Sequence, residues 1–278
     1  MGVEFLTVYW RDMVKFFRLK AMLFATLIQP IVWLALFGPA MANYFENNMM
    51  GMAAIPGTVS VDYLTFMSAG IISMTILFTC LYSGVFLQLD KQTGLLKQMM
   101  ASPMKRKHIL FGLSLGGSTK SLIQAIIIII FGFILGVRFF EGFTSINIII
   151  SIFGILLFVV LFAMGLMFLS QAIAMKMESH EGTQAVITLL TLPLFFVSNA
   201  LYPLESMPLV IKAISTVNPL TYFINGIRYF SIGKDFYSFG TNYTYTTNDI
   251  LISFAFLLGF MIVMYFLAAR IFKKAKIV

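Results

Sequence analysis

Six long apolar runs dominate this chain of 278 residues, and they constrain its fold more than any other feature. A transmembrane helix needs about 20 such residues to cross about 30 Å of hydrocarbon. The runs are continuous, whereas strands of membrane β-barrels alternate apolar and polar residues. The sequence therefore predicts an all-α polytopic membrane protein with a single transmembrane domain over 1–278. Its six predicted transmembrane helices lie at about 21–43, 63–89, 119–137, 146–175, 183–202 and 250–270.

The composition supports the same class. Hydrophobic residues make up 60% of the chain and charged residues only 11%, whereas soluble domains are about half apolar and a quarter charged. The net charge of +8 could suggest a nucleic-acid partner. The distribution of the cations argues against that interpretation, because they follow the predicted topology.

Lys and Arg set the orientation of membrane helices, because loops rich in these residues stay in the cytoplasm. With the N-terminus inside, fifteen of the nineteen Lys and Arg fall on the inner side. Both termini are then cytoplasmic. Lys120 falls near the inner end of its run, and we expect its side chain to reach the lipid headgroups. The four outer cations are Arg138, Lys212, Arg228 and Lys234.

Residues 204–249 form the predicted external segment. The stretch 207–233 is apolar, but a seventh span there would bury Lys212 and Arg228 at about 2.5–3.5 kcal/mol each. We instead expect two short re-entrant helices, followed by a polar external loop. Pro203 and Pro208 end the fifth span in a turn. Asn218 suits a helix N-cap, and Pro219 suits the first helical position.

Two amphipathic segments belong to the inner side. Residues 1–20 mix aromatic side chains with cations, which predicts an interfacial helix. Residues 90–108 leave the second span and carry Leu and Met at helical spacing, followed by a basic cluster at 105–107. This segment either rests on anionic lipid or forms a docking helix whose apolar face enters a groove in a cytoplasmic partner.

Catalytic and cofactor motifs are missing from the sequence. It contains no phosphate loop, no HExxH and no C-x-x-C motif, and only two histidines and one cysteine. We therefore expect no metal, no cofactor and no enzymatic activity in this chain itself. No acidic residue lies in the middle of a predicted span, which disfavours proton-coupled transport. Energy for uphill transport would then come from another chain.

Two segments resemble the membrane subunits of ABC type-2 exporters. The first is "FFVSNALYPLESMPLVIKAISTVNPLTYFINGIRYF", in which Pro203, Pro208, Asn218, Pro219, Tyr222 and Arg228 match a C-terminal signature of that family. The second is "LDKQTGLLKQMMASPMKRKHILFG", which resembles the segment that couples these subunits to an ATPase. The matching residues are Asp90, Gly94, Leu95, Leu96, Ser102 and Pro103, and Met99 joins the expected coupling residues through its helical spacing with the leucines. Gln92-Thr93 departs from that pattern, because the family commonly has an acidic residue before the glycine.

The resemblance implies a permease that forms a dimer with a second permease, expected to be identical, and binds two ABC ATPase subunits, which carry ATP and Mg. The segment 90–103 and the N-terminal helix would transmit ATP-driven movement, and the external helices would cap the exit. The second and fifth spans border the pathway in such dimers. We therefore expect substrate contacts among Thr75, Thr79, Thr188 and Ser198. Polar side chains within spans otherwise hold helices together.

Several alternatives stay open. The substrate expected first is a hydrophobic or amphiphilic drug or lipid, and next a polysaccharide. A gated channel without an ATPase is the alternative from another class, and a membrane-embedded enzyme is a third. Asn225 and Arg228 either line the exit or, as we favour, Arg228 pins its helix to a carbonyl or headgroup. The expected location is the cell membrane of a bacterium or archaeon.

Overall fold

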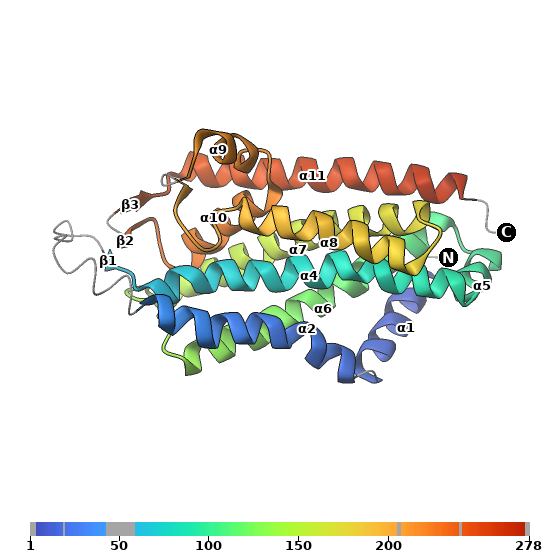
Figure 1. Ribbon diagram of the computed structural model, residues 1–278, viewed down its shortest axis with the longest axis horizontal. Helices are drawn as coiled ribbons and strands as arrows, with labels where there is room; N and C mark the ends of the chain where they lie inside the picture. Colours follow the sequence, from blue (N-terminus) through green and yellow to red (C-terminus); the bar gives the residue numbers. More distant parts are fainter. Residues whose placement is uncertain (1–3, 19, 43–58, 205–206, 239–240, 276–278) are drawn as a thin grey trace.

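The computed structural model describes residues 4–18, 20–42, 59–204, 207–238 and 241–275. Most helices run along the long axis of one bundle (Figure 1). The elements are α1 (Glu4–Arg18), α2 (Lys20–Val32), η1 (Trp33–Phe37), β1 (Val59–Ser60), α4 (Tyr63–Gln92), α5 (Leu95–Ala101), α6 (Arg106–Ile134), α7 (Ser145–Lys176), α8 (His180–Phe196), α9 (Leu209–Ser215), α10 (Pro219–Ser231), β2 (Asp235–Ser238), β3 (Thr241–Thr244) and α11 (Thr247–Lys274).

Within the described residues, four helices are long and apolar enough to cross a membrane. They are α4, α6, α7 and α11. The other two predicted spans fall on shorter helices. The first coincides with α2 and η1, which belong to an apolar helical stretch from Thr26 to Ala42. The fifth coincides with α8, which has 17 residues. The chain is thus a mainly helical membrane protein, and six spans stay a prediction.

Several boundaries differ from the predicted ones. The third span was expected to begin at 119, but α6 begins at Arg106. The first turns of α6 are helical because Ile109, Leu110 and Leu113 bury an apolar face against neighbouring helices. The fifth span was expected to reach 202, but α8 ends at Phe196. Parts of the predicted segments 1–20, 21–43 and 204–249 lie outside the described residues.

Helix α4 forms the centre of the bundle. It contacts α6, α7, α8 and α10, and its most apolar stretch is wholly buried. Helix α11 packs mainly against α7, and only 17% of its most apolar stretch is buried, so most of that stretch faces outward. Because α4 is enclosed by other helices, polar side chains on it need partners inside the protein. Ser73 and Thr75 donate to carbonyls of α4 itself, whereas the amide of Gln88 has no partner among the described residues.

The all-α prediction misses a small three-stranded sheet in the order β1-β2-β3. Strand β1 pairs in parallel with β2, and β2 pairs antiparallel with β3. We expected the polar segment 233–249 to form an external loop. Its aromatic residues decide otherwise: Phe236 is fully buried, stacks on Tyr243 and packs against Phe66 of α4.

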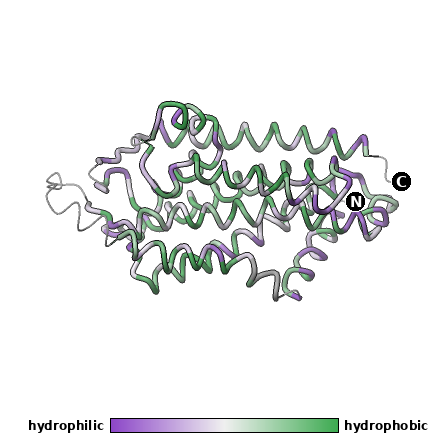
Figure 2. The backbone as a smooth tube through the Cα atoms, in the orientation of Figure 1, coloured by the Kyte–Doolittle hydropathy of each residue, from purple (hydrophilic) through white to green (hydrophobic). Residues whose placement is uncertain are grey.

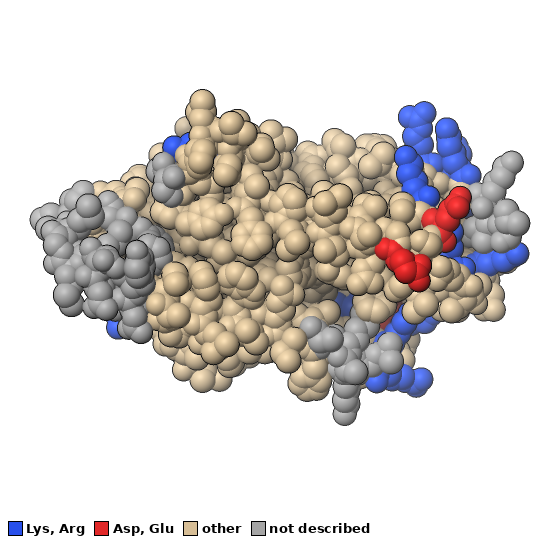
Figure 3. All heavy atoms as spheres, in the orientation of Figure 1, with Lys and Arg blue, Asp and Glu red and all other residues tan. Residues whose placement is uncertain are grey.

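The two ends of the bundle differ in composition. Strands β1 to β3 and helix α9 lie at one end, which we call the sheet end (Figure 1). Helix α5, the start of α1 and the last turn of α11 lie at the other, which we call the α5 end. The middle is hydrophobic (Figure 2), and Lys and Arg gather at the α5 end on the face seen in Figure 3. This asymmetry agrees with a cytoplasmic α5 end.

Candidate functional site

The α5 segment is a short helix between two tight connections. Gly94 adopts a left-handed conformation, with φ of 78°, in the turn between α4 and α5. A residue with a Cβ would be strained there. At the other end, Ser102 donates a hydrogen bond from Oγ to the carbonyl of Met99 at 2.7 Å. Pro103, just beyond, is exposed. The segment therefore forms a compact protrusion.

The apolar face of α5 is shared between the protein and its surroundings. Leu96 is fully buried in a cluster with residues of α6, α7 and α11. Leu95 and Met99 are half-buried, and Lys97 and Gln98 are exposed. We expected both leucines to enter a groove in a partner. For Leu96 this expectation is wrong in this conformation, because its side chain already packs in the protein's own core.

Two cations beside α5 hold the ends of other helices. Lys91 donates a hydrogen bond from Nζ to the carbonyl of Met177, at the C-terminus of α7, over 2.7 Å. Arg106 donates from Nη1 to the carbonyls of Phe272, Lys273 and Ala275, at the C-terminus of α11. The last carbonyls of a helix lack intrahelical partners and carry partial negative charge. Both cations therefore tie the segments that flank α5, the end of α4 and the start of α6, to the ends of two long helices.

Asp90 links the end of α4 to the N-terminal helix. Its carboxylate accepts hydrogen bonds from Arg11 Nη2 at 3.1 Å and from Lys15 Nζ at 2.8 Å. The Asp90 side chain is only 10% exposed, so its charge needs partners. The sequence-predicted coupling residue Asp90 thus binds α1 of its own chain.

A second ion pair joins α1 to α6. Lys120 Nζ lies 2.6 Å from Asp12 Oδ2, and both side chains are largely buried, at 9% and 13% exposure. Lys120 was expected to reach the headgroups, and that expectation is wrong. It instead turns inward, because Asp12 offers a counter-charge close by. Gly112 and Gly116 permit this approach, since a Cβ on either would overlap α1.

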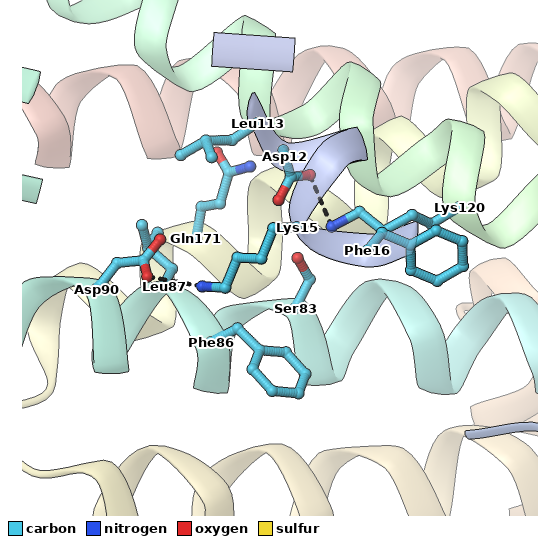
Figure 4. A pocket seen from close by; sticks show the side chains of 10 residues that line it. All are labelled: Asp12, Lys15, Phe16, Ser83, Phe86, Leu87, Asp90, Leu113, Lys120 and Gln171. Atoms are coloured by element: carbon cyan, nitrogen blue, oxygen red, sulfur yellow. Dashed lines mark hydrogen bonds and ion pairs between the residues drawn. The ribbon is translucent and has the colours of Figure 1, made fainter. Parts of the chain in front are cut away.

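The two ion pairs border a small polar cavity between α1, α4 and α6. Figure 4 shows Lys15 pointing toward Asp90, and Lys120 pointing toward Asp12. Ser83, Phe86 and Gln171 are also among its lining residues. An adjoining cavity shares Phe16, Ser83, Phe86 and Lys120 with it. Each leaves about 20 Å³ open, enough for about one water molecule. The cavities are too small for a substrate in this conformation.

Polar side chains extend this cavity along α4. Thr79 donates a hydrogen bond to the side chain of Gln124, which in turn donates to Thr26 Oγ1 at 2.7 Å. One turn along, the Tyr82 hydroxyl lies 3.2 Å from Thr188 Oγ1 on α8. The predicted pathway residues Thr79 and Thr188 therefore bridge α4 to α6 and α8, on the side toward Lys120.

The other two predicted pathway residues lie apart from this network. Thr75 and Ser198 are buried, and each donates a hydrogen bond from its hydroxyl to a nearby carbonyl, that of Ile71 and that of Phe195. A hydroxyl that donates to a nearby backbone carbonyl needs no other hydrogen-bond acceptor. Neither side chain lines the two cavities.

At the sheet end, the prediction for the start of α10 is confirmed. Asn218 is the N-cap, accepts a hydrogen bond from the Leu220 amide, and precedes Pro219 at the first helical position. Its amide group also donates to the carbonyl of Leu194 at 2.7 Å. Asn218 therefore both begins α10 and fixes it to the last turn of α8.

Arg228 fastens α10 at its other end. The sequence placed Arg228 at the outer surface, but the structure buries it, and its side chain is 0% exposed. Its Nη2 donates to the carbonyls of Asn199 at 2.7 Å and Ala200 at 3.4 Å, and the guanidinium lies 3.6 Å from the ring centroid of Phe66. Pinning to carbonyls, the favoured prediction, is confirmed.

The remaining signature residues surround α9 and α10. Tyr222 donates a hydrogen bond from its hydroxyl to the carbonyl of Thr216 at 2.7 Å and stacks on Phe256. Pro203 is buried, while Pro208 is exposed and precedes the first residue of α9. Asn225, half-buried, accepts a hydrogen bond from Asn199. These contacts hold α10 to the bundle from several sides.

Sequence reasoning missed the ionic contacts of α1. Asp12 and Lys120 are 108 positions apart, and neither belongs to a motif. One signal was present: a lysine inside an apolar run requires a counter-charge or access to water. Asp12 offers such a charge on the apolar-rich N-terminal helix. Which cation each acid would bind could not be read from spacing.

The comparisons with known proteins agree with the resemblance. A family model described as ABC-2 type transporter matches residues 3–231. The chain is 33% identical to the putative transport permease ycf38 of Porphyra purpurea over 226 residues, covering 81% of this chain and 72% of that protein. It is likewise 33% identical to the putative transport permease ycf38 of Cyanophora paradoxa, over 81% and 73% of the two chains. It is 22% identical to the daunorubicin resistance ABC transporter permease protein DrrB1 of Streptomyces coeruleorubidus, over 78% and 71%.

Proposed function

Because the chain belongs to the ABC-2 type transporter family, we propose that it is the permease subunit of an ATP-driven exporter. A separate ABC ATPase, in two copies, supplies ATP and Mg, and a second copy of the permease completes the pathway. The substrate is a hydrophobic or amphiphilic drug or lipid. The location is the cell membrane of a bacterium or archaeon, with both termini cytoplasmic.

One arrangement supports this proposal more than any other. Helix α5 protrudes at the cation-rich end, and charged residues on both sides of it bind α1, α7 and α11. A push on α5 therefore acts on three other helices through short polar contacts. A gated channel that works without an ATPase has no need for such a protrusion.

The substrate class follows from the polar network and one relative. The network beside α4 carries both signs of charge, hydroxyls and aromatic rings, which suits an amphiphile with a polar group. One relative is named for daunorubicin resistance. A polysaccharide is the alternative substrate, and nothing at the site favours it.

The test is purification of the full chain from its native membrane, with ATP hydrolysis measured in vesicles. We expect a co-purifying chain with a phosphate-loop sequence and hydrolysis that rises when an amphiphilic drug such as daunorubicin is added. Absence of any ATPase from a folded, membrane-extracted chain would contradict the proposal and favour the channel. Stimulation by an oligosaccharide lipid alone would favour the polysaccharide exporter.

A further inference from the structure

Helix α1 leaves one apolar face uncovered by the bundle. Val8, Met13 and Phe16 are buried against the protein. Leu6, Trp10 and Phe17 are 43%, 68% and 58% exposed. Residues spaced by four and seven lie on the same side of a helix, so these three form one apolar stripe. In a chain whose long helices cross a bilayer, the hydrocarbon boundary is the natural environment for such a stripe.

A cationic groove runs beside the stripe. It is a shallow, open groove lined by Arg11, Val14, Lys15 and Arg18, at the spacing of one helix face, with an open volume of about 370 Å³. Among the described residues, the only acidic partner of these cations is Asp90, which is shared by Arg11 and Lys15. Three cations thus face one carboxylate, and the groove keeps a positive excess.

Two observations indicate that this groove has capacity for another acceptor. The Nε and Nη1 atoms of Arg11 are buried and have no hydrogen-bond partner among the described residues, since only Nη2 reaches Asp90, so a shift of this side chain would bring unused donors to the groove. Arg18 is exposed, and no ion pair or hydrogen bond of its side chain is found in the described part of the chain. Guanidinium groups bind phosphate oxygens through several parallel N–H donors.

We propose that this groove binds the phosphate of an anionic phospholipid in the leaflet at the α5 end, with the acyl chains along Leu6, Trp10 and Phe17. The lipid competes with Asp90 for Arg11 and Lys15. Binding therefore weakens the contact between α1 and α4 and makes that contact dependent on the lipid composition of the membrane. The apolar stripe next to the cations favours a lipid over an acidic protein segment, which would need only the cations.

Trp10 provides a direct probe of this site. The chain has two tryptophans, so Trp33→Phe leaves Trp10 as the only one. The full-length Trp33→Phe protein is reconstituted in vesicles of phosphatidylcholine that contain a minor fraction of brominated phosphatidylglycerol or, separately, of brominated phosphatidylcholine. We expect Trp10 fluorescence to be quenched more by the anionic lipid at equal mole fraction, and the difference to shrink at high salt.

Three variants test which residues set the preference for the anionic lipid. Arg18→Gln removes an exposed cation without a described partner, so it leaves the fold intact and should lower the preference for the anionic lipid about fivefold. Asp90→Asn removes the competitor and should raise the preference. Lys107→Gln removes an exposed cation at the same end but outside the groove, and it should change nothing.

Each of these measurements has a result that would contradict the proposed lipid site. Equal quenching by the two lipids would overturn the proposal and leave an acidic segment of a partner protein as the occupant. Equal losses in Arg18→Gln and Lys107→Gln would mean general surface attraction instead of a site. A lower preference in Asp90→Asn would refute competition with Asp90. None of these measurements involves an ATPase, so they stand or fall separately from the proposed function.

Discussion

The guanidinium of Arg106, the first residue of α6, lies 2.8 Å from the carbonyl oxygen of Phe272 in the last turn of α11. The same Nη1 atom also reaches the carbonyls of Lys273 and Ala275. Residues 166 positions apart thus close the C-terminus of the last helix onto the beginning of α6. Because Arg106 follows α5 after only a short connection, this contact ties the protruding helix to the end of the chain.

Replacing Arg106 by Ala should loosen the end of α11. The carbonyls lose a cationic donor, and the local free energy of opening should fall by about 1 kcal/mol for so exposed a contact. Hydrogen exchange of the amides at 268–275 should therefore speed up several-fold. Lys107→Ala, one residue away and exposed, is the matched control. Equal exchange in both variants would show that Arg106 does not hold α11.

The buried pair of Asp12 and Lys120 should behave as a unit. Removing one partner leaves the other charge buried without compensation, at about 3–5 kcal/mol. Lys120→Met and Asp12→Asn should therefore each lower the melting temperature in detergent strongly. The double variant should recover much of the loss, because no lone charge remains. Additive losses in this double-mutant cycle would mean that the two side chains do not interact.

Substitutions of Leu95 and Leu96, the first two residues of α5, should have different effects. Leu96 is fully buried in the protein's own core, so Leu96→Ala should destabilise the fold by about 2–5 kcal/mol. Leu95 is half-buried, and Leu95→Asp should leave the fold intact while it weakens binding of the ATPase. Thermal melting and co-purification measure the two effects. A stable Leu96→Ala protein that loses the ATPase would restore the original docking assignment of Leu96.

Asn218→Ala should impair transport without unfolding the protein. The change removes the N-cap of α10 and the hydrogen bond to Leu194, at about 0.5–2 kcal/mol. Arg228→Ala should cost more, because it empties a fully buried site and frees two carbonyls. Transport per ATP hydrolysed, measured in vesicles, should fall in both. If both variants transport as much substrate per ATP hydrolysed as the parent protein, α10 has only a structural role.

The membrane orientation can be tested by cysteine labelling on a Cys80→Ala background. Asn242, exposed in β3, and Lys107, exposed near α5, lie at opposite ends of the bundle. A membrane-impermeant thiol reagent should label Asn242→Cys only from outside and Lys107→Cys only from inside. Ser238 is a poor site for this test because it is buried and bonded to the Val61 carbonyl. Labelling on the reversed sides would overturn the orientation.

The sequence by itself determined the class of protein and the local beginnings of several elements. A helix that crosses the hydrocarbon of a bilayer needs a minimum number of apolar residues. The existence of α4, α6, α7 and α11 could therefore be predicted, although their exact ends could not. The start of α10 at Asn218-Pro219 follows from neighbouring residues alone. Cation asymmetry, which is a count along the chain, predicted which end is basic.

Only the tertiary structure decided which charges meet. Asp12, Asp90, Lys120 and Arg228 each bind groups more than 25 positions away, and no spacing rule relates such residues. The burial of Leu96 and the pairing of β1 with β2 depend equally on how helices come together. An apolar or charged side chain shows that it needs a partner, but the packing of the bundle decides whether that partner is the protein itself, a lipid or another subunit.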